Sequence, residues 1–234
     1  MSISICVYSR DGIVLASDSR LTLTNTQVKN GVMYSDNTTK TFLAKQIGIS
    51  FTGISDIDSV HISKFINIFI SENINDETCV SVVPKLLKDY FNKLKANLTT
   101  TFFVAGYHKK TKEQLVYSVE LARNIIVPIS TKEPDAAWHG DPSDILSRLY
   151  SHVHHLNIDS KGRIIGHSEL DYYPIPFQHF NIQDAIDFAV HCVKVVEEII
   201  RFQPRAQSVS GSVDVLVIKP DEAFWVYKKE LHIK

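Results

Sequence analysis

Cysteine is scarce in this sequence of 234 residues, where Cys6, Cys79 and Cys192 lie far apart. Three scattered cysteines are too few for a disulfide framework or a zinc site, so we expect reduced thiols, as in the cytoplasm. No apolar run approaches the ~18 residues that a membrane span needs. The first residues also lack the basic and apolar segments of a signal peptide. We therefore expect a cytoplasmic protein that does not act on a membrane.

An excess of charge of either sign is also missing. The formal net charge is -1 and the isoelectric point is about 6.8, so no bulk attraction to nucleic acid is expected. The sequence has no phosphate-binding glycine loop and no Cys-x-x-Cys pair. His152 and His155 would share one face of a helix, but two histidines do not make a metal site. We expect no metal and no cofactor.

The residues that are present have the composition of a globular protein, with 44% hydrophobic and 22% charged residues. Alternating, β-branched segments predict the main strands, and apolar residues at steps of three and four predict the helices. The segment 21–38 is polar, with a turn signal at Asn30-Gly31. The predicted strands are 2–8, 12–17, 40–44, 47–53, 99–108, 113–121, 212–218 and 223–228, with shorter ones near 122–130 and 136–140. The predicted helices are 58–72, 81–98, 141–156 and 181–202.

The order of these elements is strands, two helices, strands, two helices, strands. We find no repeat and no linker in it, so a single domain over residues 1–234 is expected. Two sheets could stack face to face, each covered outside by a helix pair.

Three segments resemble a known family. They are "DGIVLASDSR" (11–20), "KTFLAKQIGISFTG" (40–53) and "SGSVDVLVIKPDEAFWV" (210–226). With the strand order, they resemble proteasome β-subunit-type N-terminal-nucleophile hydrolases, and most closely the bacterial proteasome-like proteins such as Anbu. The resemblance covers nearly the whole chain, with its specific motifs in the first 55 residues. It implies an α+β fold, a four-layer αββα sandwich of two stacked antiparallel sheets.

The resemblance also implies the nucleophile. In the family it is the first residue of the mature chain, sixteen positions before an aspartate, and counting back from Asp18 (18 − 16 = 2) gives Ser2. Removal of Met1 alone would expose this serine, although the family most often uses threonine. The free α-amino group could then act as the base, since its reference pKa is ~7.7–8.0. Lys40 would lower the pKa of that amine, and Asp18 would pair with Lys40.

Further roles follow from the same resemblance. Arg20 would brace the charged cluster, and the backbone N–H of Gly53 would donate to the oxyanion. Taken alone, Asp18 and Arg20 could equally be a strand-end ion pair. Lys45 is an alternative to Lys40, but a lysine in a hairpin turn is ordinarily solvated.

The C-terminal half departs from the family pattern. Ser210 occupies the place of a site serine, but Gln207 stands where an aspartate is expected three residues earlier. Ser208 is a second possible register, and it too lacks the aspartate. In "WHGDPS" (138–143), Asp141 or His139 takes the place of another site serine, and Asp141 is first of all expected to cap a helix.

The sequence therefore predicts an N-terminal serine amidohydrolase, with a peptidase as the expected class and a peptide or amide as substrate. Two alternatives stay open: an inactive assembly or scaffold protein that keeps Met1, and an amide ligase or transpeptidase. The resemblance also implies self-association into a ring or spiral, and raises the question of an ATPase partner. The helices at 58–72 and 81–98, with Ile68, Phe69 and Phe91, are the expected contact surface.

Overall fold

Two five-stranded antiparallel sheets contain most of the strands. The computed structural model describes residues 2–25, 31–94 and 98–229. The first sheet has the order β12 (Asp135–Gly140), β1 (Ile3–Tyr8), β2 (Ile13–Ser17), β15 (Asp214–Ile218) and β16 (Ala223–Tyr227). The second has the order β11 (Ile125–Ile129), β10 (Gln114–Glu120), β9 (Thr100–Tyr107), β6 (Ile47–Gly53) and β5 (Thr41–Ala44). The expected α+β class with antiparallel sheets is confirmed.

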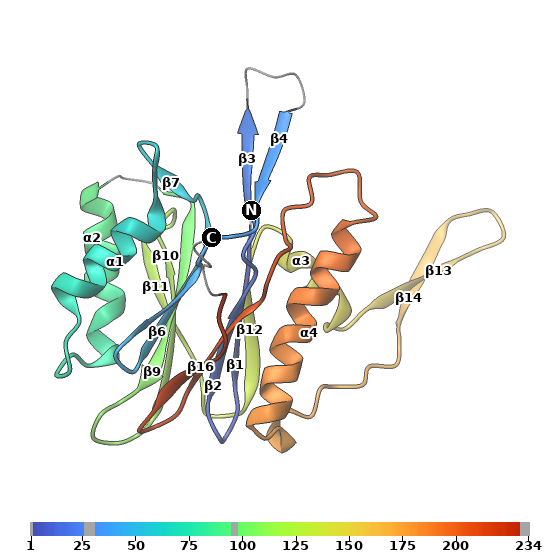
Figure 1. Ribbon diagram of the computed structural model, residues 1–234. Coiled ribbons are helices and arrows are strands. Elements are labelled where there is room, and N and C mark those ends of the chain that lie inside the picture. The colour runs from blue at the N-terminus through green and yellow to red at the C-terminus, as the bar shows by residue number, and fades with distance from the viewer. Residues whose placement is uncertain (1, 26–30, 95–97, 230–234) are drawn as a thin grey trace.

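The helices lie in two pairs on opposite sides of the sheets (Figure 1). α1 (Ile62–Asn73) and α2 (Val83–Leu94) pack with the second sheet around Phe51, Phe69 and Phe91. α3 (Ser143–Leu149) and α4 (Ile182–Ile200) pack with the first sheet in another apolar cluster. A third cluster joins residues of both sheets, among them Leu15, Phe103 and Leu216. One apolar core therefore lies between the two sheets, and each sheet has a further core with its own helix pair.

The first hairpin forms as the sequence predicts. Every residue of β1 and β2 is buried, as expected for β-branched and aliphatic strands in the middle of a sheet. The N–H of Ser9 donates to the carbonyl of Gly12 at 2.9 Å and closes the turn between them. The antiparallel register pairs Ser4 with Ser17, so the end of β2 lies beside the start of β1. This register brings Asp18 close to the N-terminal residues.

α4 is the longest helix and begins at a capping box. The Asn181 side chain accepts from the N–H groups of Gln183 and Asp184, and the Asp184 side chain accepts from the N–H of Asn181. These bonds satisfy donors that the first turn of a helix leaves free. α4 packs against β1 and β2, and so supports the strands that lead to the site.

Two hairpins are present that the sequence analysis does not predict. The polar segment 21–38 contains β3 (Leu21–Asn25) and β4 (Gly31–Ser35), an antiparallel pair that projects from the sheets (Figure 1). The residue Asn30 of the predicted turn lies outside the described residues. A further short pair, β7 (Asp56–Ile57) and β8 (Val60–His61), precedes α1, which therefore begins at Ile62.

The predicted helix over 141–156 is also shorter than expected. It ends at Leu149, and β13 (His154–Ile158) and β14 (Ile164–Glu169) form a second projecting hairpin (Figure 1). The carboxylate of Asp159 accepts from the N–H groups of Lys161 and Arg163, which closes the turn between β13 and β14. His155 thus lies on a strand, and the shared helical face proposed for it with His152 does not exist.

The expected contact surface on the helices needs a correction as well. Phe69 and Phe91 are fully buried in the core, so they add nothing to the apolar surface of α1 and α2, while Ile68 is only partly exposed. Two 3₁₀ turns complete the described elements, η1 (Val80–Val82) before α2 and η2 (Phe177–His179) before α4. Within the described residues, no helix combines the length and apolar character needed to cross a membrane.

Candidate active site

A buried ion pair lies just beyond the end of β2. Asp18 and Lys40 are 1% and 2% exposed, and both carboxylate oxygens lie 2.9 Å from Lys40 Nζ. Lys40 Nζ also donates to the carbonyl of Arg20 at 2.5 Å. Asp18 directly follows the buried β2, and Lys40 directly precedes β5 in the other sheet. The two sheets therefore bring the pair together across 22 residues of sequence.

Burial and charge act on Lys40 in opposite directions. Burial lowers the pKa of Lys40 below its ordinary value, and the negative charge of Asp18 opposes this change. A buried ammonium is costly unless its hydrogen bonds are satisfied, and here three oxygen atoms satisfy them. Such a pair adds little net stability, because the cost of taking both charges out of water offsets their attraction.

Ser2 lies next to this pair. The N–H of Ile3 donates to Asp18 Oδ1 at 3.0 Å, so the carboxylate contacts the residue that follows Ser2. Ser2 is 4% exposed. Its carbonyl oxygen lies so close to Gly140 that a Cβ added there would be 2.0 Å away, and only glycine fits. The backbone at Ser2 and Ile3 is therefore fixed by Asp18 on one side and by the end of β12 on the other.

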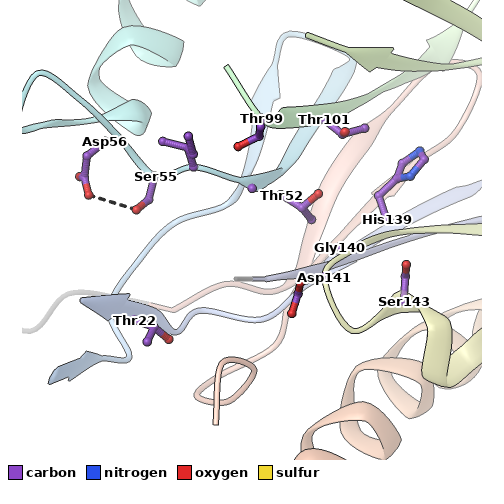
Figure 2. Close-up of a pocket in the computed structure, with 12 residues that line it drawn as sticks. Thr22, Thr52, Ser55, Asp56, Thr99, Thr101, His139, Gly140, Asp141 and Ser143 are labelled. Atoms are coloured by element: carbon purple, nitrogen blue, oxygen red, sulfur yellow. Dashed lines mark hydrogen bonds between the residues drawn. The ribbon is translucent and has the colours of Figure 1, made fainter. Parts of the chain in front are cut away.

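A pocket of about 660 Å³ opens beside Gly140. Figure 2 shows Thr52, Thr99 and Thr101 along one side of it, with Asp141 and Ser143 on the other. Hydroxyl groups come from six of the twelve lining residues: Thr22, Thr52, Ser55, Thr99, Thr101 and Ser143. The pocket can therefore offer many hydrogen bonds to a polar chain such as a peptide.

Gly53 lines the same pocket at the end of β6. Its φ of +111° is in the region that favours glycine, and a Cβ there would lie 2.0 Å from the carbonyl oxygen of Thr99. The structure thus places Gly53 in the wall of the pocket that Gly140 also lines.

The side chain of Arg20 turns away from the Asp18–Lys40 pair. Its Nε and Nη2 donate to Asp36 at 2.6 and 2.7 Å, and its Nη1 donates to the carbonyl of Gln207 at 3.3 Å. Only its main chain contacts the pair, since its N–H donates to Asp18 Oδ2 at 3.1 Å and its carbonyl accepts from Lys40. Arg20 therefore braces the cluster through its backbone.

The C-terminal candidates lie in different surroundings. Ser210 Oγ donates to Glu197 of α4 at 2.5 Å, and the Ser210 carbonyl accepts from the N–H of Ser19 at 3.3 Å. Ser208 is fully buried, and its hydroxyl has no partner among the described residues. Neither hydroxyl has a described hydrogen bond to Asp18 or Lys40. Their loop does contact the site through Ser19, which follows Asp18.

Asp141 does not cap α3. The N-cap position is taken by Pro142, which has no capping side chain, and Asp141 lies 3.9 Å from Arg205. His139 lines the pocket, and its ring lies 4.4 Å from that of Phe103. Burial lowers the pKa of His139, and its Nε2 has no partner in the described part of the chain. A neutral imidazole is the form that this environment favours.

Sequence reasoning missed two carboxylates near these groups, Asp36 and Glu197. Asp36 follows β4 within the polar segment 21–38, where no pattern distinguishes it from its polar neighbours. Glu197 lies near the C-terminal end of α4, and no motif in the sequence distinguishes it either. Only the packing of α4 against the loop before β15 brings it to Ser210.

No group of three or more His, Cys, Asp or Glu residues in the described ranges could hold a metal ion.

The chain matches no model of a known protein family and no curated protein.

Proposed function

We propose that this chain is an N-terminal serine amidohydrolase of proteasome-like type, with a peptidase as the expected activity. The buried Asp18–Lys40 pair beside Ser2 is the observation that carries the proposal. The proposed fold is the four-layer αββα sandwich of N-terminal-nucleophile hydrolases. The helix pairs on opposite sides of two antiparallel sheets support it.

The proposed reaction begins with removal of Met1, which frees the α-amino group of Ser2. Ser2 Oγ attacks the carbonyl carbon of an amide, and the neutral α-amino group accepts the hydroxyl proton. Because base and nucleophile belong to one residue, little entropy is lost in orienting them. The positive charge of Lys40 favours the neutral amine, and Asp18 holds Lys40 in place.

The rest of the site would stabilise and release the intermediate. The N–H of Gly53 donates to the oxyanion that forms on the substrate. The amine then gives its proton to the leaving nitrogen, the amide bond breaks, and an acyl ester remains on Ser2. A water molecule hydrolyses this ester and restores the serine.

Intact mass and covalent labelling test the proposal together. The purified protein should weigh one methionine less than the encoded chain. A set of tripeptide epoxyketones with different side chains is then added, because this electrophile reacts with a hydroxyl and a neighbouring free amine. We expect one adduct per chain, located on Ser2 by peptide mass spectrometry.

Two serine variants provide the controls. Ser2→Ala should abolish the adduct. Ser4→Ala should keep it, because Ser4 lies inside β1 and its hydroxyl contacts Ser50 at 2.6 Å. A homogeneous protein that keeps Met1 and takes up no probe would overturn the proposal and favour a scaffold role. Transfer of the acyl group to an added amine, in preference to water, would favour a ligase or transpeptidase.

A further inference from the structure

Arg20 joins two segments that are far apart in the sequence. Its guanidinium makes a two-point ion pair with Asp36 and donates to the carbonyl of Gln207. Its Cζ also lies 4.6 Å from the ring centre of Tyr34. Arg20 therefore links the end of the β3–β4 hairpin with the loop that leads to β15.

Asp36 determines how this guanidinium is oriented. The Arg20 hydrogen bonds hold the pKa of Asp36 below its ordinary value, so the carboxylate is charged at neutral pH. A planar guanidinium bound at two points by a carboxylate has little freedom to rotate. Without that carboxylate, the contact of Arg20 with Gln207 would depend on one bond of 3.3 Å.

The loop at 207–212 is tied to the same segments by its own main chain. The N–H of Gln207 donates to the Tyr34 hydroxyl at 3.3 Å, and the Ser210 carbonyl accepts from Ser19. The Ser19 hydroxyl in turn donates to the carbonyl of Asp36 at 3.1 Å. These main-chain ties join the loop to Ser19, which follows Asp18, and to Tyr34 on β4.

The main chain of Arg20 contacts the buried Asp18–Lys40 pair. Its N–H donates to Asp18 and its carbonyl accepts from Lys40. A shift of the Arg20 side chain would therefore disturb the backbone atoms that bind both charges. A displacement of about 1 Å at a reacting group can cost about a hundredfold in rate.

We propose that Asp36 is a positioning residue. Through Arg20, it fixes the position of the 207–212 loop relative to the Asp18–Lys40 pair. The effect of Asp36 on catalysis rests on the proposed function. Asp36 is partly exposed and has no described contact with Ser2, so it acts at a distance from the reaction.

The test compares Asp36→Asn with the wild-type protein by two measurements. The first is hydrogen exchange of the amides at 207–212, which should become faster in the variant because the guanidinium is no longer held. The second is the kinetics of labelling by the tripeptide epoxyketone. We expect the maximal labelling rate to fall by about ten- to a hundredfold, with the half-saturating concentration within about twofold.

Two other variants control the comparison. Asp159→Asn breaks an Arg–Asp pair of similar geometry, Nε–Oδ2 2.8 Å, in the projecting β13–β14 hairpin, and should change neither measurement. Tyr34→Phe removes one acceptor of the loop without removing a charge, and should speed exchange less than Asp36→Asn. Circular dichroism confirms that each variant is folded.

The outcomes separate this inference from the proposed function. Unchanged exchange at 207–212 in Asp36→Asn would overturn the inference, whatever the labelling rate. Faster exchange with an unchanged maximal labelling rate would overturn the role in catalysis. If the wild-type protein takes up no probe, the proposed function fails, while faster exchange would still support the hold of Asp36 on the loop.

Discussion

At the scale of single residues, one carboxylate organises the site. Asp18 accepts from the N–H of Ile3, the N–H of Arg20 and the ammonium of Lys40. The first donor belongs to β1 and the second to the segment that follows Asp18, whereas Lys40 directly precedes β5 in the other sheet. Lys40 is therefore the one contact that can be removed without breaking the backbone bonds of Asp18.

Lys40→Ala should abolish labelling of Ser2 and destabilise the fold. Loss of one partner of a buried pair leaves a buried charge and costs about 3–5 kcal/mol in the free energy of unfolding. Urea denaturation and probe labelling measure the two effects. The matched control is Lys45→Ala, because Lys45 is half-exposed in the β5–β6 turn and should lose almost nothing.

A double variant separates the cost of an unpaired buried charge from the loss of labelling. Lys40→Met combined with Asp18→Asn leaves no unpaired charge, so part of the stability should return while labelling stays absent. Normal labelling in a folded Lys40→Ala protein would show that Lys40 has no part in the reaction.

His139 should make the protein less stable in acid. Burial lowers the pKa of its folded form, so below about pH 6.5 the unfolded chain binds a proton that the folded chain resists. Stability therefore falls as the pH drops through this range. His139→Asn should reduce the difference in urea midpoint between pH 7.5 and 5.0.

The exposed His155 provides a control for the substitution itself, as His155→Asn, because its side chain lies on the surface of the β13–β14 hairpin. His61 contributes in the same direction, because burial also lowers its pKa, so a smaller dependence should remain in His139→Asn. Equal slopes in wild type and His139→Asn would contradict the assignment.

At the scale of elements, α4 links the fold to the site. One end begins at the Asn181 capping box, and Glu197 near the other end binds Ser210. The same helix packs against β1 and β2, which lead to Ser2 and Asp18. A disturbance of α4 should therefore reach the site through its packing on these strands and through the Glu197–Ser210 hydrogen bond.

Asn181→Ala should lower the free energy of unfolding by about 1 kcal/mol, because it removes the acceptor for two N–H groups. Urea denaturation measures the change. Asn67→Ala provides the control and should raise the free energy of unfolding slightly. Asn67 lies in the middle of α1 with its side chain exposed, and alanine is the better helix former. Equal effects of the two substitutions would show that the cap contributes nothing.

At the scale of the whole molecule, two hairpins leave the body and expose apolar side chains. Ile164 and Ile165 on β14 are 63% and 69% exposed, and Met33 on β4 is 61% exposed. Apolar surface outside the body of a fold often marks a contact with another chain. Apolar side chains are thus exposed on both hairpins, and Leu86 and Leu94 of α2 are exposed as well.

We predict a homo-oligomer of several subunits, in a ring or a spiral. Light scattering at micromolar concentration should give a mass that is a multiple of 26.5 kDa. Assembly would enclose Ser2 and limit access of other proteins to it, and an ATPase partner that delivers substrates would suit such a chamber. A clean monomer across the concentration range would contradict this prediction.

The sequence by itself determined the elements whose patterns are local and strong. β1, β2 and α4 lie where β-branched alternation or apolar residues at steps of three and four predict them. Asp18 and Lys40 could be paired in advance only because the motifs around them resemble a known family.

The tertiary structure alone decided the features that depend on distant partners. Whether the chain continues as a helix after Leu149 or forms a hairpin, and whether Phe91 is buried, depends on packing that no short window of sequence contains. The meeting of Arg20 with Asp36 and Gln207 joins three separate segments. Periodicity describes one element at a time, and these contacts exist only once the elements have packed together.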